Sequence, residues 1–187
     1  CGGCSLQHME PAAQIEFKQS VLLEQMTQAL GHDLTGVEIL PNLRESDFHY
    51  RRKARLAARF VSKKGGALVG FREKYSSYVA EISSCEVLHP SVGKILDKLA
   101  ELISNLTVYN KIAQIEVAVS EQTTALIFRN LAELSSEDVK KLYLFGEQHQ
   151  LSIYLQPGGP KTVMPLSGET QDDLSYQLDE GDITIRF

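Results

Sequence analysis

Two cysteines separated by two glycines open the chain, in the stretch Cys1-Gly2-Gly3-Cys4, and Gln7-His8 follows shortly after. Cysteine thiolates at this spacing can ligate zinc or an iron–sulfur cluster, and they can also act as a redox pair. The only other cysteine is Cys85, so the three thiols leave a four-ligand site one ligand short. Three interpretations remain open: a metal site completed by His8 or by an upstream cysteine, a redox pair, or three unrelated thiols.

A second candidate site is the cluster of cations between residues 44 and 74. It holds ten of the nineteen Lys and Arg residues, although the formal net charge of the chain is −5. Residues 49–61 alternate as a strand does, so every second cation points to the same side, about 6.6 Å from the next. That spacing is close to the distance between successive phosphates of a nucleic-acid backbone.

Aromatic residues that could stack on unpaired bases lie near these cations, namely Tyr50, Phe71, Tyr75 and Tyr78. The candidate RNA-binding residues are therefore Tyr50, Arg51, Arg52, Lys53, Arg55, Phe71 and Arg72. A different interpretation is a solvated strand face whose charges prevent edge-to-edge aggregation. The four remaining histidines are scattered and favour surface or capping roles, and no nucleotide-binding loop or nucleophile motif occurs.

Local patterns predict the elements that would position these groups. Pro11 and Gly31 bound a predicted helix, and residues 37–40 form a predicted short strand ended by Pro41. Residues 49–61, 67–73 and 78–82 predict three strands of an antiparallel meander, with a hairpin turn at residues 63–66. The third strand would deliver Cys85 to the two terminal cysteines.

The second half of the chain predicts a further compact unit. Pro90 opens a helix with an apolar stripe that continues to Leu106. Residues 111–119 and 123–129 predict a hairpin, Ser135 and Asp138 a capping box for the next helix, and residues 151–155 the following strand. The fold class predicted is therefore α+β, with a meander and a strand-strand-helix-strand unit whose helices pack on the sheet.

Composition limits the class of protein. With 187 residues, 43% of them hydrophobic, the chain can form one domain or two small ones that share a core. We find no apolar run long enough for a membrane span, and an odd cysteine count suits a reducing cytoplasm. The chain begins with Cys1 and ends on an alternating run, so we expect both ends to continue into a longer, monomeric protein.

Several motifs occur together in one order: Cys1-Gly2-Gly3-Cys4, Gln7-His8, the stretch Tyr50 to Leu56 (YRRKARL), Gly70-Phe71-Arg72 and Ser84-Cys85. In this order they resemble the middle of the iron–sulfur-containing RNA uracil-5-methyltransferases, closest to the branch that acts on bacterial 23S ribosomal RNA. The resemblance covers essentially the whole chain and is strongest from Cys1 to Cys85.

The resemblance implies roles for the residues that carry it. Cys1, Cys4 and Cys85 match three ligands of a [4Fe–4S] cluster, whose fourth ligand lies upstream in the family, so we expect no complete cluster in residues 1–187. Family members also carry an N-terminal RNA-binding β-barrel and a C-terminal domain that binds S-adenosylmethionine, both expected outside this chain. No residue matches the family's nucleophile or base, so this segment is expected to position 23S ribosomal RNA without methylating it.

Overall fold

The computed structural model describes residues 1–168, 174–178 and 183–186, and the chain divides into two compact units. Residues 4–47 form the smaller unit, and residues 1–3 and 48–187 form the larger one. The acidic residues of the tail, Asp172, Asp173, Asp179, Glu180 and Asp182, lie outside the described residues. Within the described ranges, no helix has both the length and the apolar character needed to cross a bilayer.

The smaller unit consists of helix α1, Pro11–Leu30, and an extended segment after it. The helix begins and ends as predicted: Pro11 occupies the first turn, and Gly31 adopts a left-handed φ of 73° and donates its N–H to the Thr27 carbonyl. The predicted strand at residues 37–40 is wrong, because no described strand pairs with it and a single extended segment cannot satisfy its own amides. No residue of α1 is buried.

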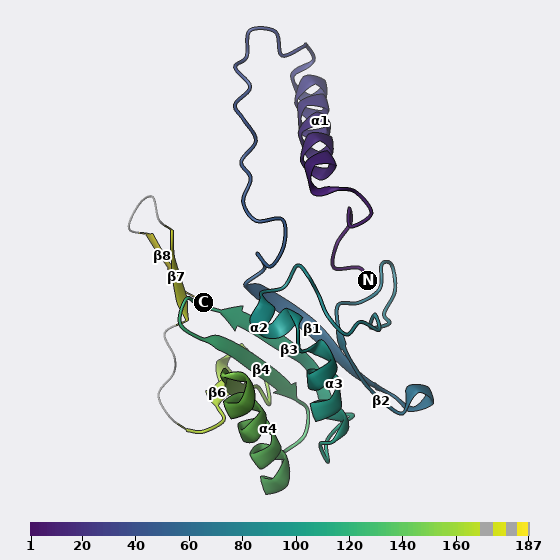
Figure 1. Cartoon of the computed structure of the whole chain (residues 1–187), viewed down its shortest axis with the longest axis vertical. Coiled ribbons are helices and arrows are strands. Elements are labelled where there is room, and N and C mark those ends of the chain that lie inside the picture. The colour runs from purple at the N-terminus through teal and green to yellow at the C-terminus, as the bar shows by residue number, and fades with distance from the viewer. Residues whose placement is uncertain (169–173, 179–182, 187) are drawn as a thin grey trace. The chain divides into compact units, whose positions relative to one another are not determined.

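The larger unit is built on one six-stranded sheet with the order β2-β1-β3-β4-β5-β6, and β7 and β8 form a separate hairpin (Figure 1). All neighbours in the large sheet are antiparallel except β4 and β5, which are parallel. The strands are β1 Lys53–Val61, β2 Gly66–Gly70, β3 Ile112–Val119, β4 Thr124–Asn130, β5 Leu151–Leu155, β6 Met164–Pro165, β7 Ser175–Leu178 and β8 Ile183–Arg186. The α+β class predicted from the sequence is confirmed.

The first hairpin is shorter than the sequence predicted. The strands β1 and β2 pair as expected across the 3₁₀ turn Ser62–Lys64, which Gly65 closes with a φ of 70°. The predicted third strand at residues 78–82 is wrong, since only an isolated bridge joins Val79 to Arg72. After this bridge the chain leaves the sheet, and the Cys85 N–H bonds instead to the Gly93 carbonyl at 2.8 Å.

The helical stripe that begins at Pro90 forms two helices, α2 Pro90–Gly93 and α3 Leu96–Ser104, rather than one. In a continuous helix the Gly93 carbonyl would accept from residue 97, but here it accepts from the Cys85 N–H. A Cβ on Gly93 would lie 2.4 Å from the Cys85 carbonyl oxygen, so only glycine permits this close approach. The break between α2 and α3 therefore leaves the Gly93 carbonyl available to Cys85, and this hydrogen bond positions the Cys85 backbone.

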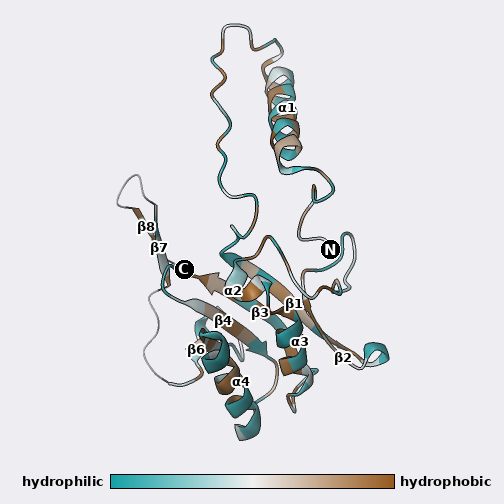
Figure 2. Ribbon diagram, in the orientation of Figure 1, coloured by the Kyte–Doolittle hydropathy of each residue, from teal (hydrophilic) through white to brown (hydrophobic). Residues whose placement is uncertain are grey.

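The core lies between one face of the large sheet and helices α3 and α4 (Ser136–His149). Fully buried residues from both layers meet there: Leu56, Leu96, Leu99, Ile103, Ile115, Leu126, Phe128 and Leu142. The strand β1 alternates as predicted, with Leu56 and Ala58 buried and Arg55 and Arg59 exposed. Figure 2 shows the same division along α4, whose ribbon carries both hydrophilic and hydrophobic colours.

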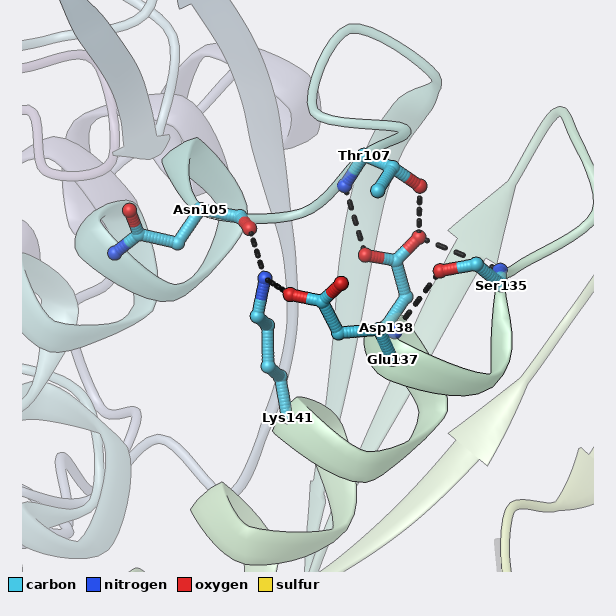
Figure 3. A network of polar contacts seen from close by, with 6 residues as sticks. All are labelled: Asn105, Thr107, Ser135, Glu137, Asp138 and Lys141. Atoms are coloured by element: carbon cyan, nitrogen blue, oxygen red, sulfur yellow. Dashed lines mark hydrogen bonds and ion pairs between the residues drawn. The ribbon is translucent and has the colours of Figure 1, made fainter.

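The first turn of α4 is fixed by a network around Asp138, which is fully buried (Figure 3). The predicted capping box is confirmed: the Asp138 N–H donates to Ser135 Oγ at 3.1 Å, and the Ser135 N–H donates to the Asp138 carboxylate at 3.4 Å. The same carboxylate accepts the Thr107 N–H at 2.7 Å and also the Thr107 hydroxyl. This carboxylate therefore ties the loop after α3 to the start of α4.

Candidate functional site

The exposed face of β1 carries the cations that the sequence assigned to one side. Lys53, Arg55 and Arg59 are exposed, whereas Leu56 and Ala58, between them on the strand, are buried. The helices α3 and α4 cover the opposite face, because their buried residues pack against Leu56. We call the side that carries Lys53, Arg55 and Arg59 the outer face, and the prediction that these three share one face is confirmed.

Some of the positive charge on the outer face is balanced by the neighbouring strand. Arg55 lies opposite Glu116 in the register of β1 and β3, and its guanidinium forms an ion pair with that carboxylate at 3.0 Å. The Arg55 side chain is 69% exposed, so the pair contributes only about 0.2–1 kcal/mol to stability. An exposed pair of this kind can open to admit a phosphate.

Arg51 and Arg52 differ from the other cations because both are half-buried. The Arg51 guanidinium lies over the Phe71 ring at 5.3 Å, and its backbone N–H and carbonyl bond to Val87 and His89. Arg52 donates from its guanidinium to the Ser120 carbonyl at 3.2 Å. These two arginines therefore hold the start of β1 in place, a role that the alternating pattern did not reveal.

The remaining predicted RNA residues differ in their surroundings. Tyr50 is exposed, Phe71 packs partly into the core, and Arg72 is exposed and donates to the Ser77 carbonyl at 3.2 Å. Arg55, Phe71 and Arg72 come together as walls of one pocket of about 410 Å³. Its other walls come from Gly2, Gly3, Ala57, Glu73, Lys74, Tyr75, Ala113 and Gln114.

Two parts of this pocket were missing from the predicted site. Gln114 and Ala113 lie on β3, which the sequence did not pair with β1, and only the register of the two strands places Gln114 opposite Ala57. The N-terminal glycines also line the pocket, because the Gly2 N–H donates to the Arg72 carbonyl at 2.7 Å. Local sequence patterns hold no signal for either contact.

Two histidines lie beside the start of β1. His89 caps α2, since its ring accepts the Ser91 N–H, and His49 contacts the Leu88 carbonyl at 3.2 Å. Burial lowers the pKa of His89, and electrostatic interaction with Arg52 and His49 lowers it further. His89 is therefore a neutral capping residue at physiological pH, in agreement with the predicted role.

The three cysteines are free thiols, with Cys1 exposed and Cys4 and Cys85 half-buried. Cys1 belongs to the same compact unit as Cys85, whereas Cys4 belongs to the smaller unit. In the described part of the chain, no three His, Cys, Asp or Glu side chains are grouped as metal ligands. Thiolates are suitable donors for a cluster.

No protein-family model matches the sequence. The chain is 44% identical over 190 residues to the 23S rRNA (uracil(1939)-C(5))-methyltransferase RlmD of Alkalilimnicola ehrlichii, which covers all of this chain and 42% of that relative. The protein of the same name from Nitrosococcus oceani is 50% identical over 164 residues, or 87% of this chain and 36% of the relative. The chain thus spans less than half the length of these relatives.

A solved structure shares the fold. The tRNA (uracil-54, C5)-methyltransferase of Pyrococcus abyssi, in complex with S-adenosyl-L-homocysteine, aligns with a TM-score of 0.61 over 98% of this chain and 44% of its own. The sequence identity is 20%, so this likeness concerns the fold alone.

Proposed function

By its sequence the chain belongs to the family of the 23S rRNA (uracil-C5)-methyltransferases, and from this premise we propose that it is the central, RNA-contacting domain of such an enzyme. The observation that carries the proposal is the outer face, where Lys53, Arg55 and Arg59 are exposed on one side of β1 and Arg55 also lines a pocket with Arg72. Cations in this arrangement suit the phosphates of an RNA strand.

The proposed reaction of the whole enzyme is transfer of a methyl group from S-adenosylmethionine to C5 of a uridine in 23S ribosomal RNA. We place the methyl donor and the catalytic residues in other domains of a longer protein, because the cysteines of this segment match only cluster ligands by resemblance. An RNA-binding β-barrel would precede the segment. The role of residues 1–187 is then to hold the RNA while the target base leaves its stack. We further propose that the protein is a monomer of the cytoplasm, where free thiols persist.

A methylation assay tests this function. The longer protein should transfer labelled methyl groups from S-adenosylmethionine to unmodified 23S ribosomal RNA, and the methyl should be found on C5 of uridine. The 187-residue chain should bind the same RNA and transfer none. Methyl transfer by the chain alone, or a longer protein that modifies a different RNA, would contradict the proposal.

We also propose that Cys1, Cys4 and Cys85 ligate a [4Fe–4S] cluster together with an upstream cysteine. The support is the donor chemistry, since all three are free thiols, and the resemblance to the cluster-containing branch. A cluster would supply structural cross-linking here, because methyl transfer involves no net electron. Cys85 would join the Cys1 segment to the loop that packs on Gly93.

Metal content tests the cluster proposal. The longer protein purified without oxygen is expected to be brown, with iron and sulfide in equal amounts, and Cys85→Ser should remove most of both. The neighbouring Ser84→Ala is the matched control and should keep the cluster. The 187-residue chain prepared in air should hold little iron. Bound zinc, or a Cys1–Cys4 disulfide that cycles with reductant, would instead support a zinc or thiol-redox module.

A further inference from the structure

The pocket on the outer face has the size of a ligand site and walls of mixed character. Its volume of about 410 Å³ lies within the range of about 300–1,000 Å³ typical of small-ligand sites. Three of its lining side chains are cations and one is an anion, and two are aromatic: Arg55, Arg72, Lys74, Glu73, Phe71 and Tyr75. This combination suits a ligand that is both anionic and aromatic.

One wall of the pocket is a short loop whose shape is fixed by hydrogen bonds. The Glu73 N–H donates to the Tyr78 carbonyl at 2.9 Å, and the Ser76 N–H donates back to the Glu73 carbonyl at 3.3 Å. The Arg72 guanidinium also donates a hydrogen bond to the Ser77 carbonyl at the other end of the loop. These hydrogen bonds fix the backbone on both sides of the tip that carries Lys74 and Tyr75.

Tyr75, at this tip, has an unfavourable backbone conformation. Its side chain is 97% exposed, and its φ of 58° is a left-handed conformation that residues with a large side chain adopt rarely. A turn with no other role would place Gly or Asn there at lower cost. Strain and an exposed ring at one position favour a role in binding.

The charges around the ring are arranged for a phosphate. Lys74 Nζ lies 5.4 Å from the centre of the Tyr75 ring, and the Arg72 side chain borders the same pocket. Arg55 is already paired with Glu116, so Arg72 and Lys74 are the cations best placed to receive an anion. Phe71 is unsuited to stacking because it packs partly into the core beneath Arg51.

We propose that this pocket binds a single unpaired ribonucleotide of an RNA strand, with the base stacked on Tyr75 and its phosphate on Arg72 and Lys74. The inference rests on the proposed RNA-binding function and adds the place where a base is received. Stacking on tyrosine tolerates any base, so the site selects unpaired nucleotides rather than a sequence.

Fluorescence anisotropy of the 187-residue chain tests the site with two probes: a short labelled oligouridylate, and an abasic ribose-phosphate oligomer of equal length. The chain should prefer the oligouridylate by about 5- to 100-fold. Tyr75→Asn, which suits the left-handed backbone, should remove this preference and leave abasic binding unchanged, and Tyr75→Phe should restore it. Lys74→Gln should weaken both probes alike. Tyr143→Ala, which removes a 48% exposed tyrosine from α4 on the other side of the sheet, is the matched control.

The outcomes separate this site from the RNA function as a whole. If Tyr75→Asn keeps the preference, or if Tyr143→Ala loses it equally, the nucleotide site is wrong while RNA binding stands. Equal competition by polyglutamate would identify a general anion site and also overturn the proposal. A chain that binds neither oligomer overturns both this site and the proposed RNA-binding function.

Discussion

Replacing Lys53, Arg55 and Arg59 together with glutamine is expected to weaken binding of a 23S ribosomal RNA hairpin at least about tenfold at physiological salt. All three are exposed on the outer face, and each can neutralise one phosphate. The slope of log affinity against log salt should fall in magnitude by about two, since fewer counterions are released. Filter binding or anisotropy at several salt concentrations measures both quantities.

A matched triple variant separates location from total charge. The control uses three other exposed lysines, Lys94, Lys98 and Lys140. They lie on or next to the helices on the opposite side of the sheet, and together they carry the same charge as the first triple. Their replacement by glutamine should leave both affinity and salt slope within about twofold of the parent chain. Equal losses in the two triple variants would show that bulk charge, rather than the outer face, governs binding. Equal thermal unfolding temperatures would show that neither triple has damaged the fold.

The alternating sequence of β1 predicted these three cations correctly but did not separate them from Arg51 and Arg52. Alternation predicted which residues of β1 point away from the core, because period-2 polarity is a local property of a strand. It also grouped Arg51 and Arg52 with the RNA residues, although the Phe71 ring and the Ser120 carbonyl engage them. Local alternation does not reveal these partners. Substitution of Arg51 or Arg52 would therefore combine loss of charge with loss of packing.

Other differences between prediction and structure have the same origin. The capping box at Ser135 and the left-handed Gly31 were predictable, since each depends on residues within one turn. The pairing of β1 with β3 depends on distant parts of the chain, and the contact of Cys85 with Gly93 depends on the break between α2 and α3. The candidate pocket combines the N-terminal glycines, two strands and a loop, so no local pattern could define it.

Replacing Asp138 with alanine is expected to destabilise the chain by about 2–4 kcal/mol at pH 7. The buried carboxylate accepts the Thr107 N–H and hydroxyl and the Ser135 N–H, and the variant leaves these donors without an acceptor. Asp138→Asn keeps the shape and one acceptor oxygen, so it should lose about half as much. Urea unfolding followed by circular dichroism gives the free energies. Glu137→Ala, which removes only the exposed pair with Lys141, should cost less than about 1 kcal/mol.

The effect of Asp138 should depend on pH in a defined direction. Burial alone would raise the pKa of this carboxyl, but the hydrogen bonds from Thr107 and Ser135 outweigh it and the pKa is lowered. A lowered folded-state pKa stabilises the fold above the unfolded pKa, near pH 4, and this stabilisation disappears as the pH falls through the folded pKa. The stability difference between the parent chain and Asp138→Asn should therefore be constant from about pH 5 to 7 and shrink below about pH 4. A difference that instead grew on acidification would mean that the folded-state pKa of Asp138 is raised, with burial outweighing the hydrogen bonds from Thr107 and Ser135.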